Sequence, residues 1–317
     1  MPRPDFPKTI FEFQKWFPDE ESCMRFLIQS RWPEGFVCPH CGYNEAYWKE
    51  KRNLLQCKKC GYQVSPTAGT VMHRSRMPLD KWFQAAYQVT TSTPGKSALQ
   101  FQRQVGLQRY ETAFTMLHKL RAAMVRTDRD RLTGLIEADE TYIGGEREGK
   151  PGRGAEGKVI VAGVVEVRNT GKGTAANRIR LMVIPDVTQR TLNEFIRHNV
   201  VTGSTIRTDD WVGYNRLSEN GYQHIVSPDE LIHIHRVFSN LKTWLLGTHH
   251  GAVRKQHLQA YLNEYTFRFN RRNTPMAAFQ TVLGLAKERM GPTYHGLYGI
   301  AKGQKAYVHP ANPIKGT

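Results

Sequence analysis

The stretch "GLIEADETYIGG", residues 134–145, places three carboxylates, those of Glu137, Asp139 and Glu140, among apolar and β-branched residues. Such a composition is typical of a β-strand. The chain around it is strongly basic, because its 317 residues hold 45 Lys and Arg against 28 Asp and Glu, a formal net charge of +17. That surplus favours a polyanionic partner, and we expect nucleic acid. We therefore expect carboxylates inside a strand of such a protein to have a chemical function.

The elements after this strand follow the order of a known type of core. Strands are predicted at 158–167 and 178–185, a helix at 188–200, and a short strand at 203–211. The next helix is predicted to open at "SPDE", residues 227–230, where the serine caps the first turn and the glutamate completes a capping box. The order β-β-β-α-β-α is that of a ribonuclease-H-like core, an α+β or α/β fold. In that fold the first and fourth strands lie side by side.

This topology brings two acids together, Asp139 on the first strand and Asp209 at the end of the fourth. Successive strand residues point to opposite faces, so Glu140 and Asp210 face away from a site that holds Asp139 and Asp209. Carboxylate oxygens suit hard cations such as Mg²⁺, and two such ions can activate the attacking oxygen and stabilise the leaving oxygen in phosphodiester cleavage. The competing interpretation is that both are exposed acids at strand ends that balance a basic protein.

Four of the five cysteines form two pairs, "CPHC" with Cys38 and Cys41, and "CKKC" with Cys57 and Cys60. Four thiolates with this spacing can close a tetrahedron on Zn²⁺, and in a reducing cytosol a metal site is favoured over disulfides. We therefore predict a zinc ribbon with a structural zinc ion.

Helices are predicted after the ribbon, and two of them, over 97–104 and 108–124, are joined by a tight turn at Val105 and Gly106. This is the layout of a helix-turn-helix motif, whose second helix can enter a major groove. The polar and basic residues of that second helix that remain for solvent or phosphate are Arg109, His118, Lys119 and Arg121. An ordinary helical hairpin with a solvated basic face explains the pattern equally well.

Several motifs resemble those of one family, the transposases of the IS1595 type of bacterial insertion sequence, also called ISXO2-like. The motifs are "CPHC … CKKCGYQVSPTAGTVMHRSRMPLDKWF", "ADETYIGG", "TDDWVGY" and "NLKTWLLGTHHG … HLQAYLNEYTFRFNRR". The resemblance covers nearly the whole chain. It implies an acid-triad (DDE-type) DNA transposase that cleaves and joins DNA at element ends, with Asp139 and Asp209 matching the first two acids.

The third position of the family's triad lies on a helix, seven residues before a lysine. Counting back from Lys242 gives His235, where many relatives carry glutamate. Seven residues make nearly two turns, so these two share a helix face, whereas Asn240 points about 140° away from His235 and is the weaker candidate. Glu230 remains a further alternative. Imidazole suits Mn²⁺ better than Mg²⁺, and the competing interpretation of His235 is a half-buried histidine bonded to a carbonyl.

Changes of composition divide the chain into four parts. We predict an N-terminal helix and zinc ribbon over 1–72, a helical, helix-turn-helix-like DNA-binding region over 73–131, the ribonuclease-H-like transposase core over 132–283, and a basic tail over 284–317. The tail is rich in Gly and Pro and lacks periodicity, so we expect it to be extended and flexible. The glycine-rich loop at 144–158 lacks a phosphate-loop pattern and is predicted to be a mobile turn near DNA.

The start of the chain has no apolar signal-peptide core, and no run of about eighteen apolar residues occurs. We therefore expect a cytoplasmic protein of the bacterial nucleoid that meets element ends and target DNA, and forms an oligomer on them. Two other functions fit the residues. One is a zinc-ribbon DNA-binding regulator with a decayed nuclease core, which His235 favours, and the other is a structure-selective nuclease without strand transfer.

Overall fold

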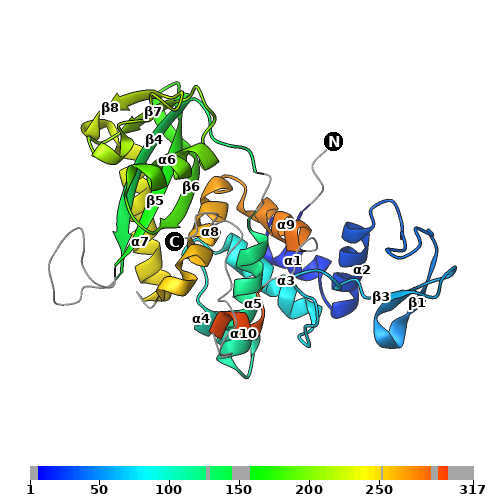
Figure 1. Ribbon diagram of the computed structural model, residues 1–317. Helices are drawn as coiled ribbons and strands as arrows, with labels where there is room; N and C mark the ends of the chain where they lie inside the picture. The colour runs from blue at the N-terminus through cyan, green and yellow to red at the C-terminus, as the bar shows by residue number, and fades with distance from the viewer. Residues whose placement is uncertain (1–5, 126–128, 145–157, 251–252, 287–291, 299–317) are drawn as a thin grey trace. The chain divides into compact units, whose positions relative to one another are not determined.

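The computed structural model describes residues 6–125, 129–144, 158–250, 253–286 and 292–298 (Figure 1). These residues form two compact units. The first takes the described residues of Met1–Met124 and Asn273–Lys305, and the second takes those of Val125–Arg272. Nearly all of the predicted glycine-rich loop, and the predicted tail beyond residue 298, lie outside the described residues.

The first unit begins with two short helices, α1 (Ile10–Trp16) and α2 (Glu20–Arg31). Asp19 and Ser22 form a capping box at the start of α2, in which the Asp19 carboxylate accepts the Ser22 N–H at 2.8 Å. A three-stranded antiparallel sheet follows in the order β1-β2-β3. Its elements are β1 (Ala46–Lys49), a 3₁₀ turn η1 (Glu50–Arg52), β2 (Leu54–Cys57) and β3 (Gln63–Val64). This sheet is the framework of the predicted zinc ribbon.

The predicted helices after the ribbon are confirmed: α3 (Leu79–Thr91), α4 (Ala98–Val105) and α5 (Tyr110–Ala123). The Ser97 hydroxyl caps α4 by accepting the Gln100 N–H at 3.2 Å. Gly106 ends the helix with φ of 67°, a left-handed conformation that glycine adopts without strain. The tight turn between α4 and α5 therefore depends on this glycine.

The first unit is completed by α9 (Pro275–Ala286), a segment that follows the whole second unit in the chain. The ring of Phe279 is fully buried there against four rings from α1, α3 and the residue after α1. Those rings belong to Phe13, Phe17, Phe83 and Tyr87. The boundary predicted at residue 283 differs from this division, and a short helix, α10 (Tyr294–Tyr298), lies within the predicted tail.

The second unit is built on a five-stranded mixed sheet in the order β6-β5-β4-β7-β8. Its strands are β4 (Leu135–Ile143), β5 (Val159–Thr170), β6 (Gly173–Ile184), β7 (Thr205–Thr208) and β8 (Gln223–Val226). The first three are antiparallel neighbours, whereas β4, β7 and β8 are parallel. The helical elements are α6 (Gln189–Asn199), η2 (Val212–Tyr214), η3 (Pro228–Glu230), α7 (Ile232–His249) and α8 (Lys255–Asn270).

Helices cover the two faces of this sheet (Figure 1). On one face, alternate residues of β5 and β6 pack against α7 and α8, with Val161, Val165 and Leu181 among them. On the other face, residues that include Ile136 and Val164 pack against α6. Because strand side chains alternate, neighbouring residues of β4 are directed to different helices.

The predicted pairing of the first and fourth strands is confirmed, because β4 and β7 are parallel neighbours. The fifth strand, β8, is missing from the prediction because only two apolar residues mark it and it lies exposed at the sheet edge. The predicted capping box at 227–230 is wrong. Ser227 makes no side-chain cap, Pro228–Glu230 forms a separate 3₁₀ turn, and α7 begins at Ile232. No helix among the described residues has the length and apolar character of a membrane span.

Candidate active site and candidate zinc centre

Two equivalent turns hold the four cysteines of the ribbon. In each turn the first cysteine donates its N–H to the carbonyl five residues later and accepts from the glycine N–H four residues later, at 2.8–3.1 Å. The glycines, Gly42 and Gly61, have φ of 72° and 71°, which side-chain-bearing residues rarely adopt. The sequence therefore builds the same sulfur-presenting turn twice.

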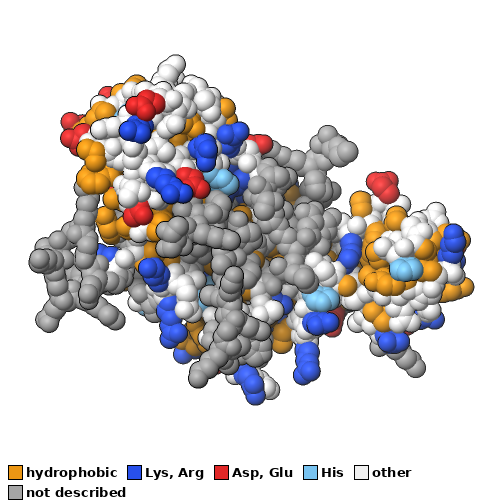
Figure 2. Space-filling model, viewed as in Figure 1, with side chains coloured by type: hydrophobic (Ala, Val, Ile, Leu, Met, Phe, Trp, Pro, Cys, Tyr) orange, Lys and Arg blue, Asp and Glu red, His pale blue; other side chains and the backbone are white. Residues whose placement is uncertain are grey.

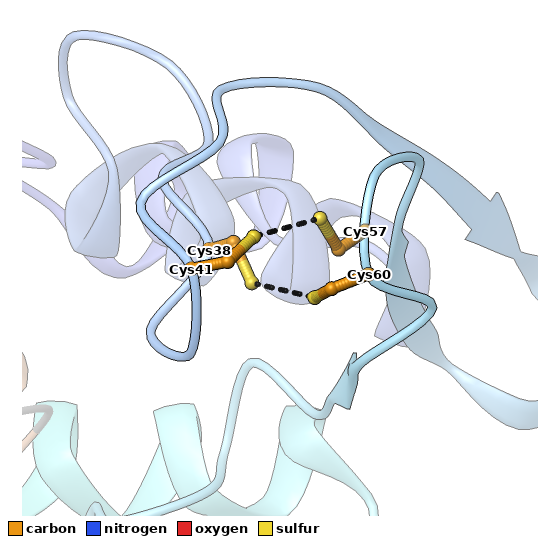
Figure 3. A group of neighbouring side chains, drawn as sticks. All are labelled: Cys38, Cys41, Cys57 and Cys60. Atoms are coloured by element: carbon orange, nitrogen blue, oxygen red, sulfur yellow. Dashed lines mark hydrogen bonds between the residues drawn. The ribbon is translucent and has the colours of Figure 1, made fainter.

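The four cysteine sulfurs meet at one point between these turns (Figure 3). All four lie within 4.8 Å of one another, with Cys38 Sγ and Cys60 Sγ 3.7 Å apart and Cys41 Sγ and Cys57 Sγ 3.6 Å apart. Four Zn–S bonds of about 2.3 Å in a tetrahedron place the sulfurs about 3.8 Å apart. The cluster therefore has the donor atoms and the close spacing that suit one structural zinc ion.

The thiols of the second pair ionise very differently. Burial opposes ionisation of Cys57, but the backbone N–H groups of Cys60 and Lys59 and the neighbouring thiols outweigh it and lower the pKa of Cys57 to about 7. At Cys60 the Tyr62 N–H favours the thiolate, yet burial and three neighbouring thiols raise its pKa to about 12. A bound cation stabilises the thiolate form of each sulfur, so this group of neighbouring thiols is suited to bind a metal ion.

Asp139 and His235 meet where α7 packs on the sheet. Asp139 Oδ2 lies 3.1 Å from His235 Nε2, and Asp139 Oδ1 accepts the N–H of Glu140 at 2.8 Å. The Asp139 side chain is 15% exposed and that of His235 is 59% exposed. Burial raises the pKa of Asp139, and the nearby Asp209 carboxylate adds to this, while the Glu140 N–H and His235 oppose it. The imidazole thus contacts a carboxylate that is costly to ionise alone.

Asp209 directly follows β7, the strand beside β4, and its Oδ1 accepts the Trp211 N–H at 3.1 Å. Asp210 is exposed. The buried hydroxyl of Tyr214 donates to Glu140 Oε2 at 3.0 Å. Burial raises the pKa of Tyr214 well above its ordinary value, and the carboxylates of Glu140, Asp139 and Asp209 raise it further. Asp139 and Asp209 are therefore brought to one end of the sheet, while Glu140 turns to Tyr214.

The structure brings Asp139, Asp209 and His235 together less tightly than the cysteines. Among the described residues, only the four cysteines form a group of three or more ligand atoms within 4.8 Å of one another. Asn240 and Lys242 are exposed farther along α7. Glu230, the other alternative, pairs with Arg207 at 2.9 Å, so its carboxylate is already neutralised by a guanidinium group.

Glu137 is a residue of this region that the sequence argument did not assign. It lies two positions before Asp139 on β4 and is 1% exposed. Its Oε2 accepts the backbone N–H groups of His233 and Ile234, each at 2.8 Å. The period of two along a strand places Glu137 on the same face as Asp139, and that was the signal available in the sequence.

Comparisons with known proteins indicate the family to which these two regions are similar. Residues 131–270 match the model of the "ISXO2-like transposase domain", and residues 18–63 match that of the "Transposase zinc-ribbon domain" of IS1595 elements. The chain belongs to the IS1595 family of transposases. A relative from Halobacterium salinarum, the "Uncharacterized protein in transposable element ISH50", is 27% identical over an alignment of 290 residues, and the match covers 80% of this chain and 92% of the relative.

Among solved structures, one chain of a simian T-cell lymphotropic virus intasome in complex with PP2A regulatory subunit B56 gamma is similar at 16% identity. The match covers 74% of this chain and 78% of that chain. Its TM-score is 0.26, which is too low to carry an argument about fold. The family assignment therefore rests on the two domain matches and the ISH50 relative.

The matched transposase domain contains Asp139, Asp209 and His235, and the matched zinc ribbon contains all four cysteines.

A third feature, in the first unit, lies beside α5. It is a cleft of about 1310 Å³, called here the basic cleft. The cations that line it are Arg74, Arg76, Arg109 and Lys119, against one carboxylate, that of Glu111. Its charge is complementary to a phosphate backbone.

Two of the four residues predicted to remain for solvent or phosphate on this helix are buried. Arg109 and Lys119 line the basic cleft, but His118 is 2% exposed and Arg121 is 1% exposed. These two are buried because α3, α4 and α9 all pack against α5, which leaves a narrower exposed face than the sequence pattern indicates. The ring of His118 lies 4.3 Å from that of Phe114. His118 and Arg121 are therefore residues of the core.

Proposed function

We propose that this chain is a DDE-type DNA transposase, which cleaves the ends of an insertion sequence and joins them to target DNA by divalent-metal-dependent phosphoryl transfer. One observation carries the proposal. Asp139 at the β4–β7 end of the sheet lies beside Asp209 and 3.1 Å from His235 Nε2, inside a matched transposase domain. Two acids and a third ligand from a helix are the side chains that such a reaction uses.

The strand order supports a ribonuclease-H-like core for this activity. An antiparallel β4-β5-β6 meander is joined to parallel β7 and β8 on the other side of β4. The β4–β7 register pairs Leu135 with Thr205 and Glu137 with Arg207. Continued by two residues, this register places Asp139 opposite Asp209, the first residue after β7.

The donor set fits a divalent cation. Burial and the second carboxylate make Asp139 costly to ionise alone, and a cation relieves both penalties. Asp139, Asp209 and His235 would hold Mg²⁺ or Mn²⁺, with the imidazole favouring Mn²⁺. When bound, such ions stabilise charge on the attacking and leaving oxygens. Lys242 is proposed as the basic residue that the family places after the third ligand.

The reaction has two phosphoryl transfers. In the first, a water oxygen attacks phosphorus at the element end, a P–O bond breaks, and the departing 3′ oxygen takes up a proton to become a hydroxyl. In the second, that hydroxyl loses its proton and attacks a target phosphodiester, whose own 3′ oxygen leaves. The number of phosphodiester bonds is unchanged in the second step, so no external energy source is needed.

DNA is the proposed partner of the rest of the molecule. The zinc ribbon, the basic cleft beside α5 and the net charge of +17 all support phosphate binding. Lys and Arg side chains are spread over the visible face, with fewer acidic groups among them (Figure 2). We place the protein at the nucleoid of the cytoplasm, as an oligomer on element ends.

A strand-joining assay tests the proposal. The zinc-loaded protein is incubated with pre-cleaved element ends and a plasmid target, in EDTA, Mg²⁺ or Mn²⁺. We expect joined products with either metal, more with Mn²⁺, and none in EDTA. Tight binding of element ends without cleavage or joining in any metal would overturn the proposal and favour the regulator. Cleavage without joining would favour the nuclease.

A further inference from the structure

The carboxylate of Glu137 is bonded to the beginning of a helix that is distant in sequence. Its Oε2 accepts the N–H groups of His233 and Ile234 at 2.8 Å each, and the side chain is 1% exposed. Burying a carboxylate is costly unless its oxygens accept hydrogen bonds, and two backbone N–H groups at a helix N-terminus supply them here. The contact therefore joins β4 to α7 through a single side chain.

The helix has no cap of its own at this end. Its N-cap residue, Leu231, makes no side-chain hydrogen bond to the first turn. The first N–H groups of any helix lack partners inside the helix, and burying them unpaired is costly. Glu137 supplies what a Ser or Asp cap supplies elsewhere, but from a strand of the sheet rather than from the helix's own chain segment. Helix α7 is thus tied to a fixed point on β4.

A second contact lies directly beside the first. Asp139, on the same face two residues further along β4, lies 3.1 Å from the imidazole of His235, the residue after Ile234. Two neighbouring residues on the same face of the strand, Glu137 and Asp139, therefore contact the consecutive helix residues 233–235. Such a pair of contacts sets both the position of α7 along β4 and the rotation of α7 about its own axis.

Glycine on the neighbouring strand allows this approach. Gly163 is the register partner of Asp139. A Cβ atom there would lie 2.7 Å from the ring of Phe238 and 3.0 Å from Ile234 Cδ1, both on α7. The helix can settle against the sheet at the level of Asp139 because this side chain is absent, and the Glu137 contact fixes it at that level.

We propose that Glu137 is a positioning residue for the active site, which fixes the start of α7 and so holds His235 at Asp139 and Asp209. The inference rests on the proposed function for the role of His235. Glu137 itself does not bind the metal or the DNA in this account. Its effect on chemistry passes through the helix.

Two variants and a matched control test the inference in the full-length, zinc-loaded protein. Glu137→Ala removes the acceptor, and Glu137→Gln keeps one acceptor oxygen without the charge. The control is Glu166→Gln, which changes another buried carboxylate, on β5, whose partners are Arg178, Asn177 and the Thr133 N–H rather than α7. All are compared at matched folded fraction by circular dichroism.

Three readouts follow. In Glu137→Ala we expect amide exchange of His233 and Ile234 to accelerate at least tenfold, Mn²⁺ affinity measured by electron paramagnetic resonance to fall at least fivefold, and joining to fall at least tenfold. Binding to element-end DNA stays within twofold. Glu137→Gln is expected to recover part of each loss, and Glu166→Gln to leave all three at wild type.

Unchanged exchange at these two amides would overturn the contact itself. Faster exchange with wild-type Mn²⁺ affinity would overturn the positioning role. Equal losses in Glu166→Gln would mean that the Glu137 variants act through general destabilisation of the fold, and the positioning role would be overturned. If the wild-type protein joins no DNA, the proposed function fails, while the exchange and Mn²⁺ readouts still decide the case for Glu137.

Discussion

Glu137, Asp139 and Glu140 lie on one strand but meet different kinds of partner. Glu137 accepts backbone N–H groups of α7, Asp139 faces an imidazole, and Glu140 accepts the hydroxyl of Tyr214. Asp139 also lies beside the Asp209 carboxylate, which adds to the effect of burial in raising its pKa. Substitution near Asp139 is therefore expected to affect chemistry more than binding.

His235 gives the first prediction at this scale. His235→Ala should lower the joining rate at least tenfold because it removes a ligand next to Asp139. His235→Glu should preserve joining and shift the preferred ion from Mn²⁺ toward Mg²⁺, because a carboxylate is a harder ligand than imidazole. Rates with each metal provide the measurement. Asn240→Ala, an exposed change on the same helix, is the control and should have little effect; if it abolishes joining while His235→Ala does not, the assignment of His235 is wrong.

At the scale of elements, Gly163 determines how closely α7 packs on the sheet. Gly163→Ala should destabilise the second unit by about 1–3 kcal/mol, because the new Cβ overlaps the ring of Phe238 in a packed core. Joining should fall with it as His235 moves from Asp139. Urea unfolding followed by the joining assay measures both. The control is Gly171→Ala, at a position with nothing within 4 Å of the added atom, and comparable destabilisation there would contradict the packing argument.

The strands and helices that the sequence predicts correctly are those with a strong apolar period. The alternating strands β4, β5 and β6 and the amphipathic α6 are of this kind, and the pairing of β4 with β7 follows from their order. The short edge strand β8 has too few apolar residues to be recognised. The start of α7 is displaced because its cap comes from Glu137, and a contact between segments so far apart leaves no local signal.

The same limit applies to the candidate site. Spacing and strand order predict that Asp139 and Asp209 approach each other, and the seven-residue count to Lys242 selects His235. Alternation identifies the face of each side chain but not its partner, so the roles of Glu137 and Tyr214 could not be read from the sequence. On α5, periodicity cannot reveal that three helices, one of them from the far end of the chain, pack against it and that His118 and Arg121 are buried.

At the scale of the whole molecule, the zinc cluster and the sheet of the second unit belong to different compact units. Cys57→Ser should release zinc from the purified protein and unfold the ribbon, because structural zinc supplies much of the folding free energy of such a module. The cooperative unfolding of the second unit should remain. Metal analysis and limited proteolysis measure the two effects. Full zinc retention in the variant would count against a four-cysteine site.

Electrostatics gives a second prediction at this scale. Affinity for random duplex DNA should fall steeply with salt, because a protein of charge +17 releases condensed counterions when it binds. Arg76→Ala, in the basic cleft, should weaken binding and reduce the slope of log affinity against log salt by about 0.9. Arg216→Ala is the control, since Arg216 is exposed outside the cleft and faces Glu219 at 3.7 Å. An equal effect of both changes would mean that the cleft has no special role.

The most direct test of the proposed chemistry compares Asp139→Asn, Asp209→Asn and Asp210→Asn in the joining assay, with DNA affinity measured in parallel. The first two should each abolish cleavage and joining in Mg²⁺ and Mn²⁺ while leaving affinity within about twofold, because binding comes from basic residues elsewhere. Asp210→Asn changes an exposed neighbouring acid and should remain active. An Asp139→Asn protein that still cuts and joins DNA would contradict the proposed active site.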